Sequence, residues 1–245
     1  DLAYVGCGVT ASAVAMDKDI CKAVCRNAGV PVVDWFVVTA AEWQADREGV
    51  LQRALGEFGL GIFVKPANMG SSVGVSSACS PEELEVAIDL AVRFDRRVLI
   101  ESALLSPREL EVSVLGNEEV AVSAIGEITP GAEFYTYADK YEDGVAGLHI
   151  PAVLSEDERA RTHELAERVY RAIDGAGLSR IDFLMSEGEI YLNEVNTLPG
   201  FTAISMYPKL WEHSGISVDQ LANRLITLAI ERHAERRQLK AAKPE

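Results

Sequence analysis

The chain has 245 residues, of which 48% are hydrophobic and 25% charged, so it can bury a sizeable core in one or two domains. Its formal net charge of −15 lacks the basic footprint that a nucleic-acid backbone requires, which excludes nucleic acid as the expected partner. No apolar run approaches the roughly 18 residues of a membrane helix, and no basic and apolar leader opens the chain. We therefore expect a cytoplasmic protein with no membrane partner.

The first part of the chain predicts an α+β unit with an antiparallel sheet. Helices are expected at residues 17–27, 39–58 and 80–94. Capping boxes at Thr39–Glu42 and Ser80–Glu83 predict the starts of the last two helices, and Gly29 the end of the first. Strands are expected at 31–38, 61–66 and 98–101, with a further one beginning at residue 75.

The second part alternates polar and apolar residues and predicts a second α+β unit. Strands are expected at 109–115 and 120–125, a hairpin at 179–196, and helices at 155–174 and 218–232. The segment 129–150 is rich in Gly, Tyr and charge without a helix or strand period, which is typical of a lid. We divide the chain into a leading segment and linker (1–16), two subdomains (17–103 and 104–235) and a frayed tail (236–245).

The predicted hairpin carries the first chemical signal. Because side chains alternate along a strand, one face should hold Arg180, Asp182 and Leu184 on the first strand and Ile190, Leu192, Glu194 and Asn196 on the second. A turn at Gly188 brings Asp182 opposite Asn193 and Glu194. Two carboxylates and an amide oxygen suit a hard cation, most naturally Mg²⁺ shared with phosphate oxygens. The alternative is a solvated face with a surface ion pair.

The segment from Lys65 to Gly74 carries the second signal. Its glycines and serines allow backbone N–H groups to surround a phosphate, and the lysine before them supplies charge. The lysine precedes the glycines, so this is not a Walker A motif. Alone, the segment is equally compatible with a plain β-turn.

These signals occur together with several further motifs in a fixed order. The set comprises Met16–Lys18, Val64–Pro66, Gly70–Gly74, Leu99–Glu101, Arg108–Val112, Phe134–Tyr141, Arg180–Asp182 and Asn193–Thr202. In this combination the chain closely resembles D-alanine–D-alanine ligases of the ATP-grasp superfamily, over roughly residues 4–231. One departure is Thr136, where the family usually has aspartate.

The resemblance implies an ATP-grasp fold, in which two α+β subdomains with antiparallel sheets grip ATP between them. Members of the family have a further N-terminal domain, and we expect this chain to lack it. The implied reaction joins two D-alanines through a D-alanyl phosphate, with ATP and two Mg²⁺ ions (or Mn²⁺) as cofactors, for peptidoglycan precursors. The implied assembly is a homodimer. The alternatives are a ligase that takes D-serine or D-lactate second, and a nucleotide-binding fragment without activity. Tyr141 favours an amine over D-lactate.

The resemblance also implies a role for each matched residue. The metal ligands would be Asp182, Glu194 and Asn196. The nucleotide would be bound by Lys18, Lys65, Ser72, Lys140 and Asn193 around the phosphates, by Glu101, Ser102, Ala103 and Leu104 at the adenine, and by Glu109 at the ribose. Arg180 and the N–H of Gly200 would form an oxyanion hole. Ser71 and Tyr141 would orient the first D-alanine, and Ser205 and Met206 would hold the second.

Overall fold

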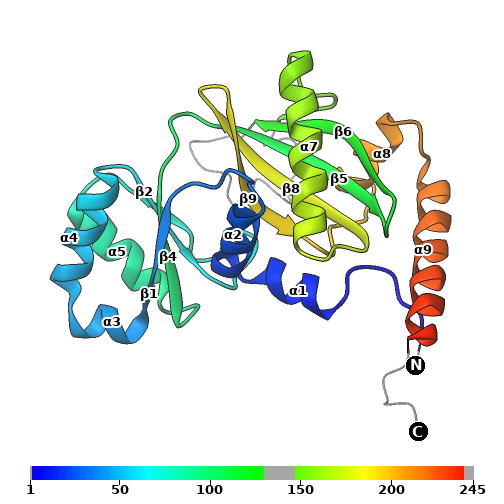
Figure 1. Cartoon of the computed structure of the whole chain (residues 1–245). Coiled ribbons are helices and arrows are strands. Elements are labelled where there is room, and N and C mark those ends of the chain that lie inside the picture. Colours follow the sequence, from blue (N-terminus) through cyan, green and yellow to red (C-terminus); the bar gives the residue numbers. More distant parts are fainter. Residues whose placement is uncertain (1, 130–146, 240–245) are drawn as a thin grey trace, which may run out of the picture.

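The structure, a computed structural model, describes residues 2–129 and 147–239. It contains two antiparallel sheets with helices packed against them, which confirms the expected α+β class (Figure 1). Most of the expected lid, including Lys140 and Tyr141, lies outside the described residues. Within the described ranges, no helix is both long and apolar enough to cross a membrane.

The first sheet has four strands in the order β1-β4-β2-β3. They are β1 (Trp35–Thr39), β2 (Ile62–Pro66), β3 (Ser76–Ala78) and β4 (Arg97–Ser102). The covering helices are α3 (Ala40–Ala45), α4 (Arg47–Phe58) and α5 (Pro81–Ala91). One face of the sheet supplies Val64 and Ile100 to a core shared with these helices. Because strand residues alternate, the neighbouring Lys65 and Glu101 point to the opposite face.

Two helix predictions in this sheet's neighbourhood need correction. The single helix expected over 39–58 is two helices, because Asp46 leaves the helical conformation and caps α4 by accepting the N–H of Gly49. The box at Ser80 is only half formed. Its hydroxyl accepts the N–H of Glu83, whereas the Glu83 carboxylate accepts the N–H of Cys79.

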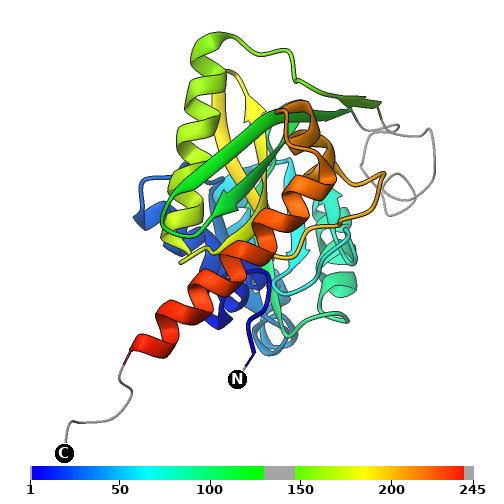
Figure 2. The same cartoon turned by 90° about the vertical axis from the view of Figure 1, so that its right-hand side faces the viewer.

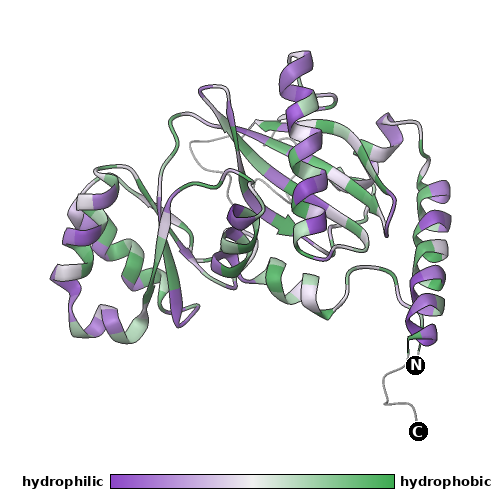
Figure 3. Ribbon diagram, viewed as in Figure 1, coloured by the Kyte–Doolittle hydropathy of each residue, from purple (hydrophilic) through white to green (hydrophobic). Residues whose placement is uncertain are grey.

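The second sheet has five strands in the order β7-β6-β5-β8-β9. They are β5 (Arg108–Gly116), β6 (Val120–Thr129), β7 (Gly147–His149), β8 (Gly177–Ser186) and β9 (Glu189–Asn196). One face is covered by α1 (Val9–Met16), α2 (Lys18–Asn27) and α7 (Glu156–Ala172). Part of the other face lies against α8 (Met206–His213) and α9 (Val218–Gln238) (Figure 2). Hydrophobic residues dominate α1, while α7 and α9 alternate in the manner of amphipathic helices (Figure 3).

Several elements of this second unit differ from expectation. Helices α1 and α8 were not predicted, since neither has a side-chain N-cap and each is held mainly by burial of residues such as Ala11 and Trp211. Strand β7 lies in the segment expected to lack regular structure, and it pairs with the end of β6. Helix α9 continues to Gln238 rather than ending near residue 232.

Helix α2 connects the two sheets. Cys21 and Cys25 on one side of the helix pack into the core of the five-stranded sheet. At its start, Arg97 from β4 forms ion pairs with Asp17 and Asp19. The first turn of α2 is therefore fastened to the four-stranded sheet, while its buried side belongs to the other sheet.

Candidate active site

Strands β8 and β9 form the expected hairpin. Asp182 lies opposite Glu194, as predicted, and Arg180 lies opposite Asn196. Cross-strand partners share a face, so these four polar side chains occupy one patch of the sheet.

A β-bulge interrupts the same hairpin at Asn193. Phe183 pairs with Leu192 directly after the Asp182–Glu194 pair, which leaves Asn193 as an extra residue. The prediction that Ile190 and Leu192 share a face with Glu194 is therefore wrong. Both residues lie on the opposite face of the strand. Both enter the core on the α7 side, where Val195 also lies, because the bulge shifts the alternation by one residue.

The polar patch is organised around Arg180. Its guanidinium donates from Nε and Nη2 to the two Asp182 oxygens at 2.7 and 2.8 Å, and Nε lies 3.1 Å from Glu111. Burial by itself would lower the pKa of Arg180, but Asp182 and Glu111 outweigh it and raise that pKa. Arg180 is therefore a permanent cation with a fixed orientation.

The expected metal ligands lie together. The Asn196 amide nitrogen is 3.0 Å from a carboxylate oxygen of Asp182 and 3.5 Å from one of Glu194. Both carboxylates thus meet at the Asn196 amide nitrogen, and their oxygens are ligands of the kind that Mg²⁺ prefers. Among the residues described, no three His, Cys, Asp or Glu side chains gather to hold a metal alone. Further ligands would therefore have to be amide, water or phosphate oxygens.

Two lysines lie near this patch, one on strand β2 and one on helix α2. Lys65 of β2 is 2.8 Å from Glu101 and donates to the amide oxygen of Asn193 at 3.3 Å. This contact joins the two sheets through a pair of predicted nucleotide-binding residues. Lys22 of α2 binds the other oxygen of Glu101 at 2.7 Å. Burial alone would raise the pKa of Glu101, but the two lysines reverse this and lower it to about 2.

The Gly/Ser segment lies next to the start of α2. The Lys18 ammonium donates to the carbonyl oxygen of Met69, and the Lys18 N–H donates to Ala67 at 2.9 Å. Ser71 and Ser72 have φ values of 52° and 58°, in the left-handed region. Successive residues in such conformations are found in backbone nests that bind anions. Burial lowers the pKa of Lys18.

The predicted adenine segment follows β4. The N–H groups of Ser102 and Ala103 are held by the carbonyls of Asp34 and Gly61, at 3.1 and 2.9 Å. These bonds fix the direction of the chain toward Leu104. The predicted ribose ligand Glu109 lies near the start of β5, opposite Leu184 of β8.

The predicted substrate residues meet at the start of α8. The Ser205 hydroxyl accepts the N–H of Thr202 at 3.1 Å, and a Cβ added to Gly200 would lie 2.8 Å from that hydroxyl. Met206 opens the helix, so its N–H is among those without an intrahelical acceptor. The N–H of Met206 and the hydroxyl of Ser205 thus lie together at this helix start, which suits a carboxylate. Of the two residues expected to orient the first D-alanine, Ser71 is described and Tyr141 lies outside the described residues.

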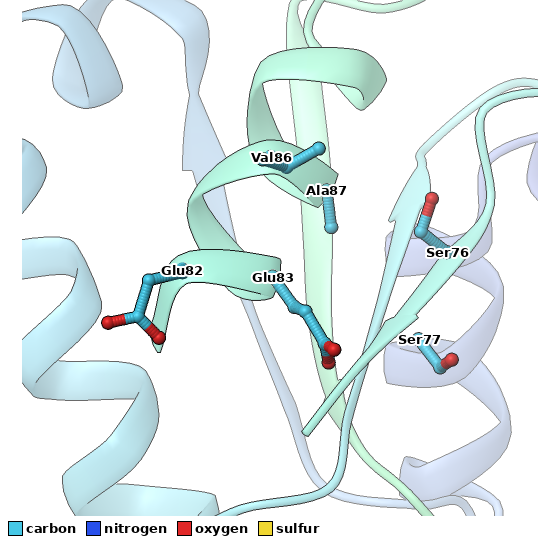
Figure 4. Close-up of a pocket in the computed structure, with 6 residues that line it drawn as sticks. All are labelled: Ser76, Ser77, Glu82, Glu83, Val86 and Ala87. Carbon is cyan, nitrogen blue, oxygen red and sulfur yellow. The ribbon is translucent and has the colours of Figure 1, made fainter. Parts of the chain in front are cut away.

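Two site residues were missed in the sequence. Lys22 pairs with Glu101, and its spacing of four residues from Lys18 on a helix was the available signal. Glu111 belongs to the Arg108–Val112 motif, yet only the fold shows that it contacts Arg180. A hollow lies away from these residues, between β3 and α5. It has a volume of about 380 Å³ and is lined by Ser76, Ser77, Glu82, Glu83, Val86 and Ala87, none of them predicted site residues (Figure 4).

Comparison with known proteins identifies the family. Residues 24–227 match the family described as D-ala D-ala ligase C-terminus. The chain belongs to the D-alanine–D-alanine ligase family. A relative named D-alanine–D-alanine ligase, from Heliobacterium modesticaldum, is 50% identical over 235 residues, which cover 95% of this chain and 64% of the relative.

Solved structures of D-alanine–D-alanine ligase family proteins share the fold. The D-alanine-D-alanine ligase from Coxiella burnetii superposes with a TM-score of 0.85 at 36% identity, over 97% of this chain and 63% of that one. The VanG D-Ala:D-Ser ligase from Enterococcus faecalis gives 0.82 at 32% identity, over 92% and 64%. The expected ATP-grasp architecture is thereby confirmed. The chain spans somewhat less than two thirds of the length of each of these three proteins.

Proposed function

We propose that this chain forms the ATP-binding and ligating part of an ADP-forming D-alanine–D-alanine ligase that supplies peptidoglycan precursors. The observation that carries the proposal is the Lys65–Asn193 contact of 3.3 Å, which sets a lysine of the four-stranded sheet beside the strand that bears Glu194 and Asn196. Such an arrangement suits a nucleotide whose phosphates lie between cations and a metal held by Asp182, Glu194 and Asn196. We infer subdomains at 17–103 and 104–235, a cytoplasmic location and a homodimer.

In the proposed reaction, the carboxylate of one D-alanine attacks the γ-phosphorus of ATP and ADP leaves. The amine of a second D-alanine then attacks the resulting acyl phosphate, and phosphate leaves from the tetrahedral intermediate. Bound Mg²⁺, two ions or Mn²⁺ in their place, would neutralise charge on the phosphates. Lys18, Lys65 and Lys140 would bind phosphate oxygens, with Ser72 and Asn193 beside them.

The remaining residues bind and orient the substrates. Arg180 and the N–H of Gly200 would stabilise the negative oxygen of the intermediate, a contribution of roughly 3 kcal/mol for one preorganised donor. The 101–104 segment would contact the adenine and Glu109 the ribose. Ser205 and Met206 would bind the carboxylate of the second D-alanine, while Ser71 and Tyr141 would orient the first.

The experiment is to incubate the intact protein with ATP, Mg²⁺ and D-alanine, and to quantify the products. We expect one ADP and one phosphate for each D-alanyl-D-alanine. Formation of AMP would assign a different ligase class. ATP binding without any dipeptide would favour a nucleotide-binding role alone.

A second candidate is a ligase that takes D-serine as its second substrate. It is favoured by the likeness to the VanG D-Ala:D-Ser ligase, at 32% identity. Competition between D-alanine, D-serine and D-lactate at pH 6 to 9 separates these activities. We expect D-alanyl-D-alanine to dominate at pH 7 and above, with little ester, because Tyr141 adds no positive charge that would repel an ammonium. Tyr141→Phe should shift the ratio toward the ester at low pH.

A further inference from the structure

Lys22 lies beside the site and is the most deeply buried lysine or arginine among the described residues. It is 2% exposed, and its ammonium lies 2.7 Å from one oxygen of Glu101. The other oxygen of Glu101 lies 2.8 Å from Lys65. Two lysines thus share one buried carboxylate.

The two lysines differ in what they can reach. The Lys65 side chain retains 13% of its exposure and also contacts Asn193, whereas the Lys22 side chain retains 3%. Lys22 is enclosed further by the Trp35 ring, whose centroid lies 5.2 Å from its ammonium. Lys65 is therefore able to meet a ligand, and Lys22 is not.

The net charge of Lys22, Glu101 and Lys65 together suggests a role for Lys22. A pair of Lys65 and Glu101 alone would be neutral, and its attraction for phosphate would be weak. We propose that Lys22 is a positioning residue that neutralises Glu101, so that the Lys65 ammonium keeps its positive charge uncompensated for a nucleotide phosphate. The inference rests on the proposed function, because it assumes that the site binds ATP.

The protonation states agree with this arrangement. Burial lowers the pKa of Lys22 to about 8, partly offset by Glu101, so Lys22 is still charged at pH 7. The three groups therefore carry one excess positive charge. In a buried setting such a charge acts strongly on a phosphate a few ångströms away, because little solvent screens it.

The test compares ligands that share adenosine but differ in charge. The dissociation constants of adenosine, ADP and ATP are measured by calorimetry at pH 7 with Mg²⁺, for the intact wild-type protein and for Lys22→Met. We expect Lys22→Met to weaken ATP by about ten-fold or more and ADP by less. Adenosine should change by less than about two-fold, since it has no phosphate charge.

Removing the carboxylate should reverse the loss. Lys22→Met/Glu101→Gln restores the excess charge and should return the ratio of ATP to adenosine affinity to that of wild type. Glu101→Gln alone should raise this ratio. This single variant tests the inference by itself if Lys22→Met does not fold. Arg26→Met is the matched control. Arg26 lies one turn along α2 and stacks on the same Trp35 ring at 4.3 Å, but its partner Asp34 is exposed.

The outcomes are separable. Equal weakening of adenosine and ATP by Lys22→Met would assign Lys22 a purely structural role and overturn the inference. Unchanged ATP affinity, or a double variant no better than Lys22→Met, would also overturn it. Failure of wild type to bind ATP would instead remove the proposed function, and the inference with it.

Discussion

Asp182 and Glu194 are direct cross-strand partners, and the next pair along the hairpin skips one residue. Their carboxylates both reach the amide of Asn196, which places them where a cation can be shared. We expect Glu194→Gln to reduce ADP release in the presence of D-alanine by at least about a hundred-fold, because an oxygen charge that binds the metal is lost. Glu189→Gln, on the exposed start of the same strand, should keep full activity.

Melting curves of the two variants complete this test. Both proteins should unfold at nearly the wild-type temperature, since neither carboxylate is in the core. Substantial Mg²⁺-dependent ATP turnover by Glu194→Gln would show that the metal is held elsewhere.

Gly74 closes the Gly/Ser segment in a conformation that other residues rarely adopt. Its φ is +72°, and an added Cβ would lie 2.6 Å from the Phe94 ring and 2.8 Å from Pro66. We expect Gly74→Ala to destabilise the protein by about 1–3 kcal/mol and to weaken ATP binding. Gly70→Ala, in the same segment but in open space, should do neither. Urea unfolding and calorimetry measure both effects, and equal behaviour of the two variants would contradict the explanation.

Glu101 should make the protein sensitive to acid. Its pKa is about 2 in the folded protein against an ordinary value of 4.5, so its stabilising contribution is complete above pH 4.5 and is lost as the pH falls toward 2. The contribution is on the order of 3 kcal/mol. Urea unfolding between pH 6 and 3 should therefore show a shallower decline for Glu101→Gln than for wild type. If the free energy of unfolding fell equally in both proteins, other carboxylates would determine the loss of stability in acid.

Glu111 should act on the reaction through Arg180, which it contacts at 3.1 Å. We expect Glu111→Gln to lower kcat by about ten-fold while leaving the KM for ATP nearly unchanged, because the guanidinium loses one of its two carboxylate partners. Steady-state kinetics at varied ATP provides the measurement. A rise in KM at constant kcat would place Glu111 in nucleotide binding instead.

The sequence predicts those parts of the fold that local patterns determine. Alternation predicted β8 and β9, and the helix expected at 155–174 is α7, which begins at a capping box formed by Ser155 and Glu158. Helices α1 and α8 escaped because burial against other elements stabilises them, and burial is not a local property. For the same reason the bulge at Asn193 could be found only once both strands of the hairpin were paired.

The candidate site divides in a similar way. Spacing within one hairpin was sufficient to bring Asp182, Glu194 and Asn196 together. The pairing of Lys22 with Glu101 joins residues far apart in the chain, and no pattern in either segment indicates it. The roles of Lys65 and Asn193, which meet across the two sheets, came from the family resemblance, and that resemblance did not indicate Lys22.

The indole of Trp35 gives the protein an internal optical reporter. Of the three tryptophans in the chain, Trp43 and Trp211 are buried in the two cores at 1% and 2% exposure. Trp35 is partly exposed, donates to Asp19 at 2.8 Å and lies beside Lys22. Nearby charges shift the emission maximum of an indole. A ligand that alters the electric field around α2 should therefore shift the emission maximum of Trp35, while the emission of Trp43 and Trp211 stays unchanged. Nucleotide binding could then be followed in real time without attaching a label.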